Sequence, residues 1–186
     1  ACVVQGLLGI GHAFAFDVSA ACSGFVFALD IVQKYLAAGI VKTALIISAE
    51  ALTRITDFTD RASCVLFGDG AGACVVRAGE GRYAAHLCSD GSGVSMLYAG
   101  TSYPLTPFES EEARKEGAAF ETIRDGFLHM DGKGVYKFAV EAMPQAILDA
   151  CETLGVQPEE LGLIVPHQAN IRIIQTAMKR LGLSMD

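Results

Sequence analysis

Two residues of this chain, Cys22 and His167, stand where an apolar run gives way to a helical pattern, and together they could transfer or hydrolyse an acyl group. Cys22 lies in the string Asp17-Val18-Ser19-Ala20-Ala21-Cys22-Ser23-Gly24. A thiol at the first turn of a helix faces unsatisfied backbone amides and the positive end of the helix dipole, which favours the nucleophilic thiolate. A cysteine among apolar residues is usually a packed core residue. The small residues around Cys22, however, suit a sharp turn that lets a substrate approach the sulfur.

His167 follows an apolar run at 161–165 and precedes a second helical pattern. Pro166 should end the run, so that the imidazole falls in the connection and can point across a cleft at a sulfur. A lone histidine after a strand more often has a structural role. Two such junctions, one with a thiol and one with an imidazole, are a better indication of nucleophilic catalysis than either alone.

The elements that would position Cys22 follow the pattern of an α/β protein. Residues 22–38 are apolar around most of a helical circumference and are followed by Gly39, which predicts a buried helix. The runs at 13–16 and 43–49 predict a strand before and after this helix, the second an interior parallel strand, so that the three form a βαβ unit.

The elements around His167 repeat this alternation. The pattern predicts a strand at 74–76, a boundary between two halves near 79–81 and a solvated acidic excursion at 109–125. After these it predicts a helix at 133–154, a strand at 161–165 and a helix at 171–181. Pro144 should kink or split the first of these helices. The last helix would place Ile171, Ile174, Met178 and Leu181 on one face. Arg172 and Lys179 are seven residues apart on this helix and predict a basic face.

Composition restricts the class of protein. The chain has 186 residues, 52% of them hydrophobic and 19% charged, which is enough to bury a core. A net charge of −7 argues against nucleic acid as the main partner. No stretch of about eighteen uninterrupted apolar residues predicts a membrane span. The six cysteines form no CxxC pair, which argues against a zinc site or another metal site and against a disulfide framework, and indicates a reducing, cytosolic compartment.

The string Gly68-Asp69-Gly70-Ala71-Gly72 superficially suggests a dinucleotide-binding loop. The last glycine of that fingerprint is misplaced, and a strand follows where a helix is needed. We therefore expect tight-turn geometry here and no nucleotide cofactor.

Four strings together resemble the β-ketoacyl-acyl-carrier-protein synthase III family of the thiolase-like superfamily. They are Phe16-Asp17-Val18-Ser19-Ala20-Ala21-Cys22-Ser23-Gly24-Phe25, Thr59-Asp60-Arg61, Phe67-Gly68-Asp69-Gly70-Ala71-Gly72 and Val165-Pro166-His167-Gln168-Ala169-Asn170-Ile171-Arg172. The resemblance implies a layered α/β/α/β/α thiolase-like fold, here incomplete. Residues 1–80 would belong to its N-terminal half, and residues 81–186 would form the first part of its C-terminal half.

The resemblance also implies a function, the initiating condensation of type II fatty-acid synthesis. Cys22 would take the acyl group from acyl-coenzyme A, a substrate and not a cofactor. His167, with an asparagine, would stabilise the charge formed when malonyl-acyl-carrier protein loses carbon dioxide. Arg61 would pack on the coenzyme A adenine, Phe67 would line the acyl pocket, Met130, Gly132 and Asn170 would line the pantetheine tunnel, and Arg172 and Lys137 would meet the acidic carrier protein. Family members resemble one another in forming homodimers, and residues 2–10 would lie near that interface.

One feature departs from the family pattern. The family's catalytic asparagine, in a Gly-Asn-Thr-Ser motif, lies beyond the equivalent of Asp186, and Asn170 is the only asparagine in this chain. The resemblance therefore implies a fragment lacking both ends, which alone would at most accept an acyl group on Cys22. Sheet edges and apolar faces would then be exposed.

Three alternatives stay open. The first is a related condensing or acyl-transfer enzyme of secondary metabolism with the same Cys-His-Asn set. The second is a Cys-His hydrolase, against which the βαβ context and the His-Gln-Ala-Asn string argue. The third is a non-catalytic module that binds a carrier protein, which the presence of both Cys22 and His167 disfavours.

Overall fold

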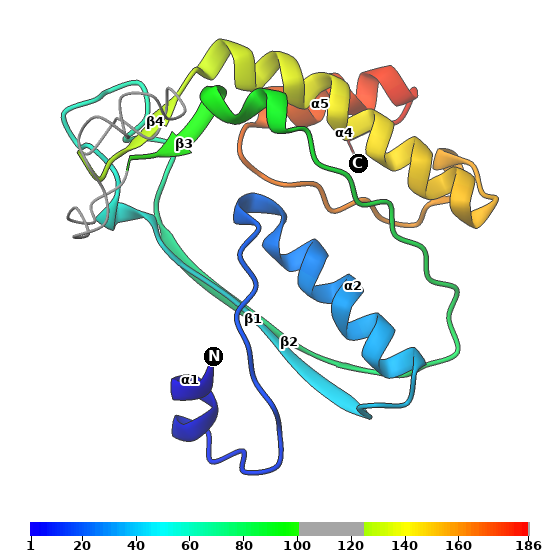
Figure 1. Cartoon of the computed structure of the whole chain (residues 1–186). Helices are drawn as coiled ribbons and strands as arrows, with labels where there is room; N and C mark the ends of the chain where they lie inside the picture. The colour runs from blue at the N-terminus through cyan, green and yellow to red at the C-terminus, as the bar shows by residue number, and fades with distance from the viewer. Residues whose placement is uncertain (101–124, 186) are drawn as a thin grey trace. The chain divides into compact units, whose positions relative to one another are not determined.

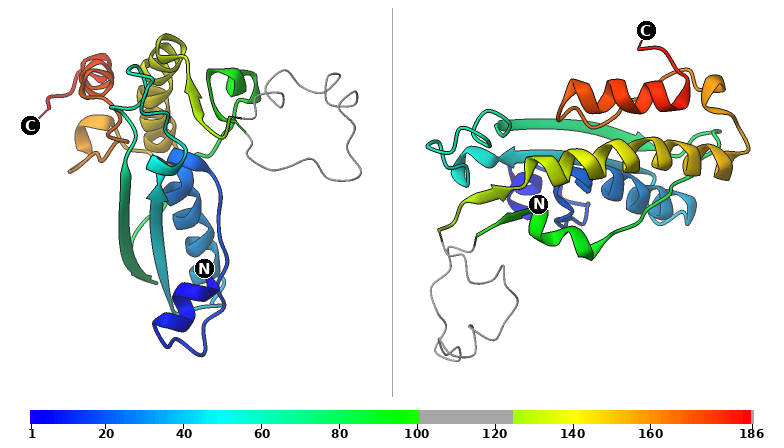
Figure 2. Two further views of the ribbon diagram at one scale, coloured as in Figure 1. Left: turned by 90° about the vertical axis from the view of Figure 1, so that its left-hand side faces the viewer. Right: turned by 90° about the horizontal axis from the view of Figure 1, so that it is seen from above.

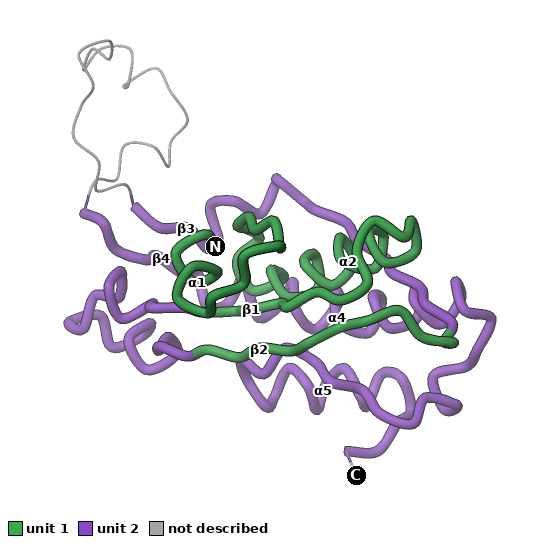
Figure 3. Tube along the Cα trace, turned by 90° about the horizontal axis from the view of Figure 1, so that it is seen from below, with its two compact units in different colours: residues 1–49, 71–81 green, residues 50–70, 82–186 purple. Residues whose placement is uncertain are grey.

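The computed structural model describes residues 1–100 and 125–185 (Figure 1). They form two compact units, unit 1 with residues 1–49 and 71–81 and unit 2 with the described parts of residues 50–70 and 82–186 (Figure 3). The excursion expected at 109–125 lies outside the described residues except for Asp125. The division into halves at residue 80 stays a prediction.

Unit 1 carries the first junction. It contains α1 (Cys2–Leu7), α2 (Gly24–Ala37) and most of β1 (Thr43–Ala51) and β2 (Asp69–Arg77), which pair as a two-stranded sheet. The helix predicted at 22–38 and the strands predicted at 43–49 and 74–76 are confirmed as elements. The prediction that 43–49 is an interior strand is wrong, because β1 pairs only with β2 among the described residues. The prediction of a buried helix is wrong for most of α2, because only Leu36 is buried and the side chains of Phe25 and Val26 are 45% and 51% exposed.

The apolar run at 13–16 does not form the predicted strand. It packs on α2 through its aromatic rings instead: Phe14 and Phe16 stack with ring centroids 6.2 Å apart, and Phe14 meets Tyr35 edge to face at 5.5 Å. A strand requires a neighbour for its backbone hydrogen bonds, and among the described residues no strand pairs with this run. The βαβ prediction is therefore wrong at its first strand.

Unit 2 carries the second junction. Its β3 (Leu97–Ala99) and β4 (Leu128–Met130) pair antiparallel, with Tyr98 opposite His129. They are followed by α4 (Gly132–Leu154) and α5 (Ile171–Leu181), and both predicted helices are confirmed. Pro144 does not split α4. Each helix ends at a glycine in the left-handed conformation, Gly155 with φ 66° and Gly182 with φ 70°, as the absence of a Cβ allows.

The helices α4 and α5 pack side by side and run in the same direction (Figures 1 and 2). Tyr136 Oη lies 3.4 Å from Thr176 Oγ1, and one helical turn further along both helices Arg180 Nη1 donates to the carbonyl oxygen of Val140 at 2.8 Å. The sequence separation is 40 in both pairs, which requires parallel helices in fixed register. The Arg180 guanidinium also binds the Glu141 carboxylate at 2.7 Å. The N-termini of α4 and α5 therefore lie at the same end of the pair.

The face of α5 that is buried differs from the predicted one. Of the predicted face only Met178 is buried, together with Ile173 and Ala177, whereas Ile171 is 57% exposed. The reason is that α4 contacts the side of α5 that carries Thr176 and Arg180. On α5, Ile171, Ile174 and Met178 line an open groove of about 660 Å³. The other lining residues are 158, 159, 161–164, 166, 168 and 183–185.

Two further expectations of local structure are wrong. Residues 161–165 form no strand, and Leu163 and Val165 are 81% and 78% exposed, since no strand pairs with them among the described residues. The glycine string at 68–72 is not a tight turn: β2 begins at Asp69, and Gly68, Gly70 and Gly72 all have negative φ.

The α4–α5 ion pair predicts a pH-dependent contribution to stability. The hydrogen bond from Arg180 holds the pKa of Glu141 below its ordinary value of 4.5. A depressed carboxyl pKa stabilises the fold above pH 4.5, and this contribution is lost as the pH falls through the folded-state pKa. We expect Glu141→Gln to lower the free energy of unfolding near neutral pH and to have a much smaller effect at about pH 3.

Urea denaturation at about pH 7 and about pH 3 measures this difference. Glu152→Gln, on an exposed part of the same helix, is the matched control and should shift stability little at either pH. An equal effect of Glu141→Gln at both pH values would contradict the assignment.

Candidate functional site

Cys22 lies on a strained turn that leads into α2. It is the middle residue of a 3₁₀ turn, Ala21–Ser23, and Ser23 is the N-cap of the helix. Ala21 has φ 45°, and it is the only non-glycine residue with positive φ in the described part of the chain. A left-handed conformation costs a residue with a Cβ roughly 1–2 kcal/mol. The Cys22 thiol is exposed on this strained turn at the start of the helix. An accessible thiol in this position is what the sequence predicts for a nucleophile.

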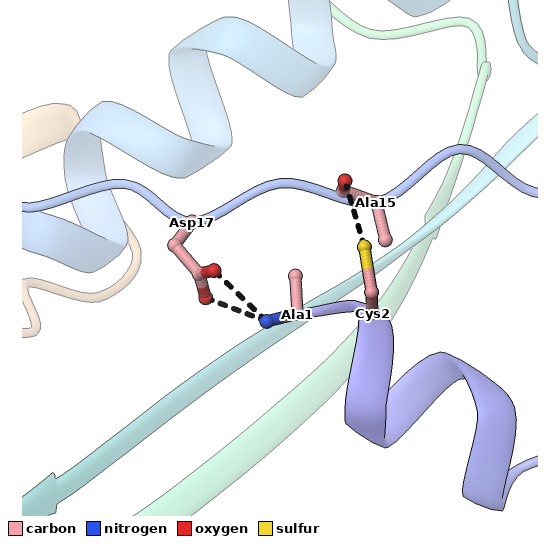
Figure 4. Close-up of polar contacts among 4 residues, drawn as sticks. All are labelled: Ala1, Cys2, Ala15 and Asp17. Atoms are coloured by element: carbon pink, nitrogen blue, oxygen red, sulfur yellow. Dashed lines mark hydrogen bonds and ion pairs between the residues drawn. The ribbon is translucent and has the colours of Figure 1, made fainter.

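The segment that enters this turn is held by polar contacts to α1 (Figure 4). The Asp17 carboxylate accepts hydrogen bonds from the amino group of Ala1 at 2.8 and 2.9 Å, and the Cys2 thiol lies 3.8 Å from the carbonyl oxygen of Ala15. The contact between Cys2 and Ala15 joins α1 to the aromatic run at 13–16.

His167 lies on the connection that leads into α5, four residues before the helix begins at Ile171. His167 is exposed, as are Asn170 and Arg172. The side-chain oxygen of Asn170, the N-cap, accepts a hydrogen bond from the Arg172 amide at 2.9 Å. The cap explains locally why the helix begins at Ile171. It leaves the imidazole on the connection, where the sequence places it.

Met130 and Gly132 lie at the N-terminal end of α4. Asp131 between them is the N-cap, whose side chain accepts from the amides of Lys133 at 3.1 Å and Gly134 at 3.2 Å. Its own amide donates to the carbonyl oxygen of Met96 at 2.8 Å. Because α4 and α5 are parallel, the structure brings this end of α4 beside the end of α5 that follows Asn170.

Arg61 is exposed on a turn that two aspartates anchor. The Asp60 carboxylate accepts from the Ala62 amide at 3.0 Å and from the Ser63 hydroxyl. The Ser63 hydroxyl, with the Ala62 amide, holds the pKa of Asp60 below its ordinary value. Asp57 similarly accepts from the amide and the hydroxyl of Thr59, at 2.8 and 2.7 Å. The turn is therefore fixed on both sides of Thr59.

Phe67 is half-buried two residues before Asp69. The Asp69 carboxylate accepts from the amide of Thr53 at 2.9 Å and from its hydroxyl at 2.8 Å. These bonds, the amide first, lower the pKa of Asp69. They join the end of β1 to the start of β2 and position the residues that precede it.

Sequence reasoning missed His129 on β4. Its Nε2 lies 2.8 Å from the Asp125 carboxylate, and its ring stacks on Tyr98 with centroids 5.1 Å apart. The neighbouring Leu128 amide donates to the carbonyl oxygen of Ile55 at 2.7 Å, so the turn that carries Arg61 is attached to the strand that carries Met130. No local pattern signals this contact, because the partners are about seventy residues apart in the sequence.

The basic residues divide into two kinds. Arg172 and Lys137 are exposed on α5 and α4. Lys179, which the sequence places on a basic face with Arg172, is exposed as well. The neighbouring Arg180 differs, because its guanidinium is bound to Glu141 and to the carbonyl oxygen of Val140.

All five predicted substrate-binding residues lie in unit 2. Cys22 belongs to unit 1 and His167 to unit 2, and their pairing stays a prediction. Within residues 1–100 and 125–185 no cluster of three or more His, Cys, Asp or Glu side chains could hold a metal ion. In the same residues, every helix is too short or too polar to cross a bilayer.

Comparison with known proteins gives consistent matches. The family described as 3-oxoacyl-[acyl-carrier-protein] synthase III matches residues 16–91, and its C-terminal part matches residues 151–186. The β-ketoacyl-[acyl-carrier-protein] synthase III of Clostridium acetobutylicum is 43% identical over 188 residues, which are 100% of this chain and 55% of that protein. This chain thus has about half the length of the curated relatives that it matches.

Solved structures agree with this match. The synthase III from Thermus thermophilus superposes with a TM-score of 0.81 at 41% identity, over 99% of this chain and 54% of that one. The priming β-ketosynthase of the R1128 polyketide pathway gives a TM-score of 0.81 at 33% identity, over 99% of this chain and 52% of that one. The predicted thiolase-like α/β fold is confirmed.

The strained turn predicts an unusual response to glycine. Ala21→Gly removes the Cβ clash, worth roughly 1–2 kcal/mol, and adds about 0.5–1 kcal/mol of chain entropy to the unfolded state. We therefore expect the free energy of unfolding to stay the same or rise by up to about 1.5 kcal/mol. Ala20→Gly is the matched control: φ at Ala20 is −145°, so this change should lower stability by about 0.5–1 kcal/mol. Urea denaturation distinguishes the two, and equal losses would contradict the strain.

Proposed function

Because this chain belongs to the 3-oxoacyl-[acyl-carrier-protein] synthase III family, we propose that it carries the acyl-accepting cysteine and the histidine of a condensing enzyme that initiates type II fatty-acid synthesis. The observation that carries the proposal is the exposed Cys22 thiol on a strained turn at the start of α2. A nucleophile needs this combination of access and electrostatic support.

In the first step the Cys22 thiolate attacks the thioester carbonyl of acyl-coenzyme A. The carbonyl re-forms as the bond to the coenzyme A sulfur breaks, coenzyme A leaves as a thiol after taking a proton, and the acyl group stays on Cys22. In the second step malonyl-acyl-carrier protein loses carbon dioxide, and its carbanion attacks the acyl carbonyl and releases the Cys22 sulfur. A neutral His167 would donate a hydrogen bond to the enolate oxygen that forms in this step.

The remaining predicted residues fit substrate binding by their positions. Arg61 would pack on the adenine, Phe67 would line the acyl pocket, and Met130, Gly132 and Asn170 would line the pantetheine tunnel. Asn170, the only asparagine in the chain, already uses its side-chain oxygen as the cap of α5. The proposal therefore gives it a binding role and not the role of the family's catalytic asparagine.

The proposal includes a partner and a compartment. An acidic carrier protein would meet Arg172 and Lys137. A second copy of the chain would cover the apolar residues at 2–10, where Val3 and Leu7 are 77% and 83% exposed. All six cysteines are free, which supports a reducing compartment such as the cytoplasm.

A second candidate is the priming condensation of secondary metabolism. The likeness to the R1128 priming β-ketosynthase favours it, since that protein and the Thermus thermophilus enzyme superpose equally well. The same residues would act in both reactions, and the two differ in the acyl donor that is accepted.

Acyl transfer to Cys22 predicts a covalent adduct. The complete protein should gain one acetyl group, seen by intact-mass spectrometry, after incubation with acetyl-coenzyme A, and Cys22→Ala should gain none. Cys88→Ala removes another exposed thiol and should be acetylated as the unchanged protein is. A folded protein that gains no adduct from acetyl or longer acyl donors would overturn the proposal and favour a non-catalytic binding module.

Carrier-protein binding predicts a salt-dependent effect of charge reversal. Arg172→Glu should weaken binding of the malonyl-carrier protein about tenfold at low salt, and the loss should shrink as salt rises. Lys42→Glu, an exposed residue of unit 1, is the control and should change binding little. Surface plasmon resonance at two salt concentrations measures both, and an unchanged Arg172→Glu affinity would contradict this docking surface.

A further inference from the structure

Two of the predicted substrate-binding residues, Arg61 and Phe67, lie on one loop of unit 2, the segment 53–69 that connects β1 with β2. Asp69 joins the two ends of this loop. Its carboxylate accepts a hydrogen bond from the Thr53 amide at 2.9 Å and another from the Thr53 hydroxyl at 2.8 Å, one on each oxygen. A single side chain thus closes a loop that carries two residues of the proposed site.

Overlapping backbone turns connect the two substrate-binding positions within this loop. The carbonyl oxygen of Asp60 accepts from the Cys64 amide at 3.0 Å, and the carbonyl oxygen of Ser63 accepts from the Leu66 amide at 2.9 Å. Ser63 is only 3% exposed, so the middle of the segment is packed against its surroundings. Because the turns overlap, a displacement at one end of this segment is transmitted to the other end.

The start of the loop is fixed independently of Asp69. The Leu128 amide on β4 donates to the carbonyl oxygen of Ile55 at 2.7 Å. The hydroxyl of Thr56, a residue that is 4% exposed, donates to the carbonyl oxygen of Leu52 at 2.8 Å. These bonds hold the start of the loop, and Asp69 holds the end of the loop against that start. The segment that carries both substrate-binding positions is therefore placed from two sides.

We propose that Asp69 is a positioning residue that closes this loop and thereby sets two recognition events together, that of the coenzyme A adenine by Arg61 and that of the acyl group by Phe67. The inference rests on the proposed function, since it takes these roles of Arg61 and Phe67 from it. Asp69 does not need to touch the substrate, because both of its oxygens already bind Thr53. It restricts the loop before the substrate arrives, which lowers the entropy cost of binding.

The test measures two preferences of the complete protein by following the acylation of Cys22 with intact-mass spectrometry. The nucleotide preference is the ratio of the second-order rate constants for acetyl-coenzyme A and acetyl-pantetheine, and the acyl preference is that ratio for acetyl- and butyryl-coenzyme A. Arg61→Ala should lower only the nucleotide preference, and Phe67→Ala should change only the acyl preference. Asp69→Ala should lower the nucleotide preference about tenfold and also shift the acyl preference in the direction that Phe67→Ala does.

Further variants separate positioning from loss of structure. Asp69→Asn keeps an oxygen for the Thr53 amide and can donate to the Thr53 hydroxyl, so it should recover most of both preferences. Thr53→Val removes only the hydroxyl bond and should shift both preferences less, with no further effect when it is added to Asp69→Ala. If Asp69→Ala does not fold, Thr53→Val alone decides the test. Asp90→Ala is the matched control, because Asp90 also accepts from an amide and a hydroxyl, both of Ser92, and should leave both preferences unchanged.

The outcomes distinguish this inference from the proposed function. Equal losses with all three donors would show that Asp69 supports folding in general, and they would overturn the inference, as would a change in only one preference or no change. The assignments of Arg61 and Phe67 would stand if their own variants behave as expected. If those two variants change neither preference while Cys22 is still acylated, the assignments fail and the inference fails with them. If no donor acylates Cys22 in the unchanged protein, the proposed function itself fails.

Discussion

The parallel pairing of α4 and α5 is the constraint on which the arrangement of unit 2 depends. Two polar contacts one turn apart, Tyr136 with Thr176 and Val140 with Arg180, keep the helices in register. A shift by one turn would break both contacts and separate Arg180 from Glu141. Because the helices are parallel, their N-caps Asp131 and Asn170 lie at the same end of the helix pair. The residues that precede each helix therefore lie at that end as well.

Short polar side chains set the local geometry in this unit. Aspartates 57, 60, 69, 90 and 131 and Asn170 each accept a hydrogen bond from a backbone amide two or three residues away, or from Thr53 in the case of Asp69. Such bonds fix a turn without a surrounding core. They explain how the turn that carries Arg61 and the connections into α4 and α5 can have defined positions although most of their residues are exposed.

Features that depend on neighbouring residues could be predicted from the sequence. The helices at 133–154 and 171–181 follow from apolar spacing and terminal glycines, and the small residues around Cys22 indicate the turn on which it lies. Strands without a partner could not be predicted correctly: 13–16 and 161–165 have apolar strand composition, but composition does not supply the hydrogen bonds of a neighbouring strand. The buried face of α5 and the attachment of β4 to Ile55 depend on contacts between residues about forty and about seventy positions apart, which no local pattern encodes.

The antiparallel pairing of β3 with β4 also affects how the family can vary. The hydrogen bond from the Gly100 amide to the Phe127 carbonyl oxygen, 2.7 Å long, closes the chain just beyond these strands. Residues inserted or deleted between positions 100 and 125 would therefore leave the two ends of the segment in place. The position of Met130 at the end of β4, just before α4, would not change. The number of residues between positions 100 and 125 can therefore change during evolution without moving Met130. Differences in length between homologues are expected to concentrate here.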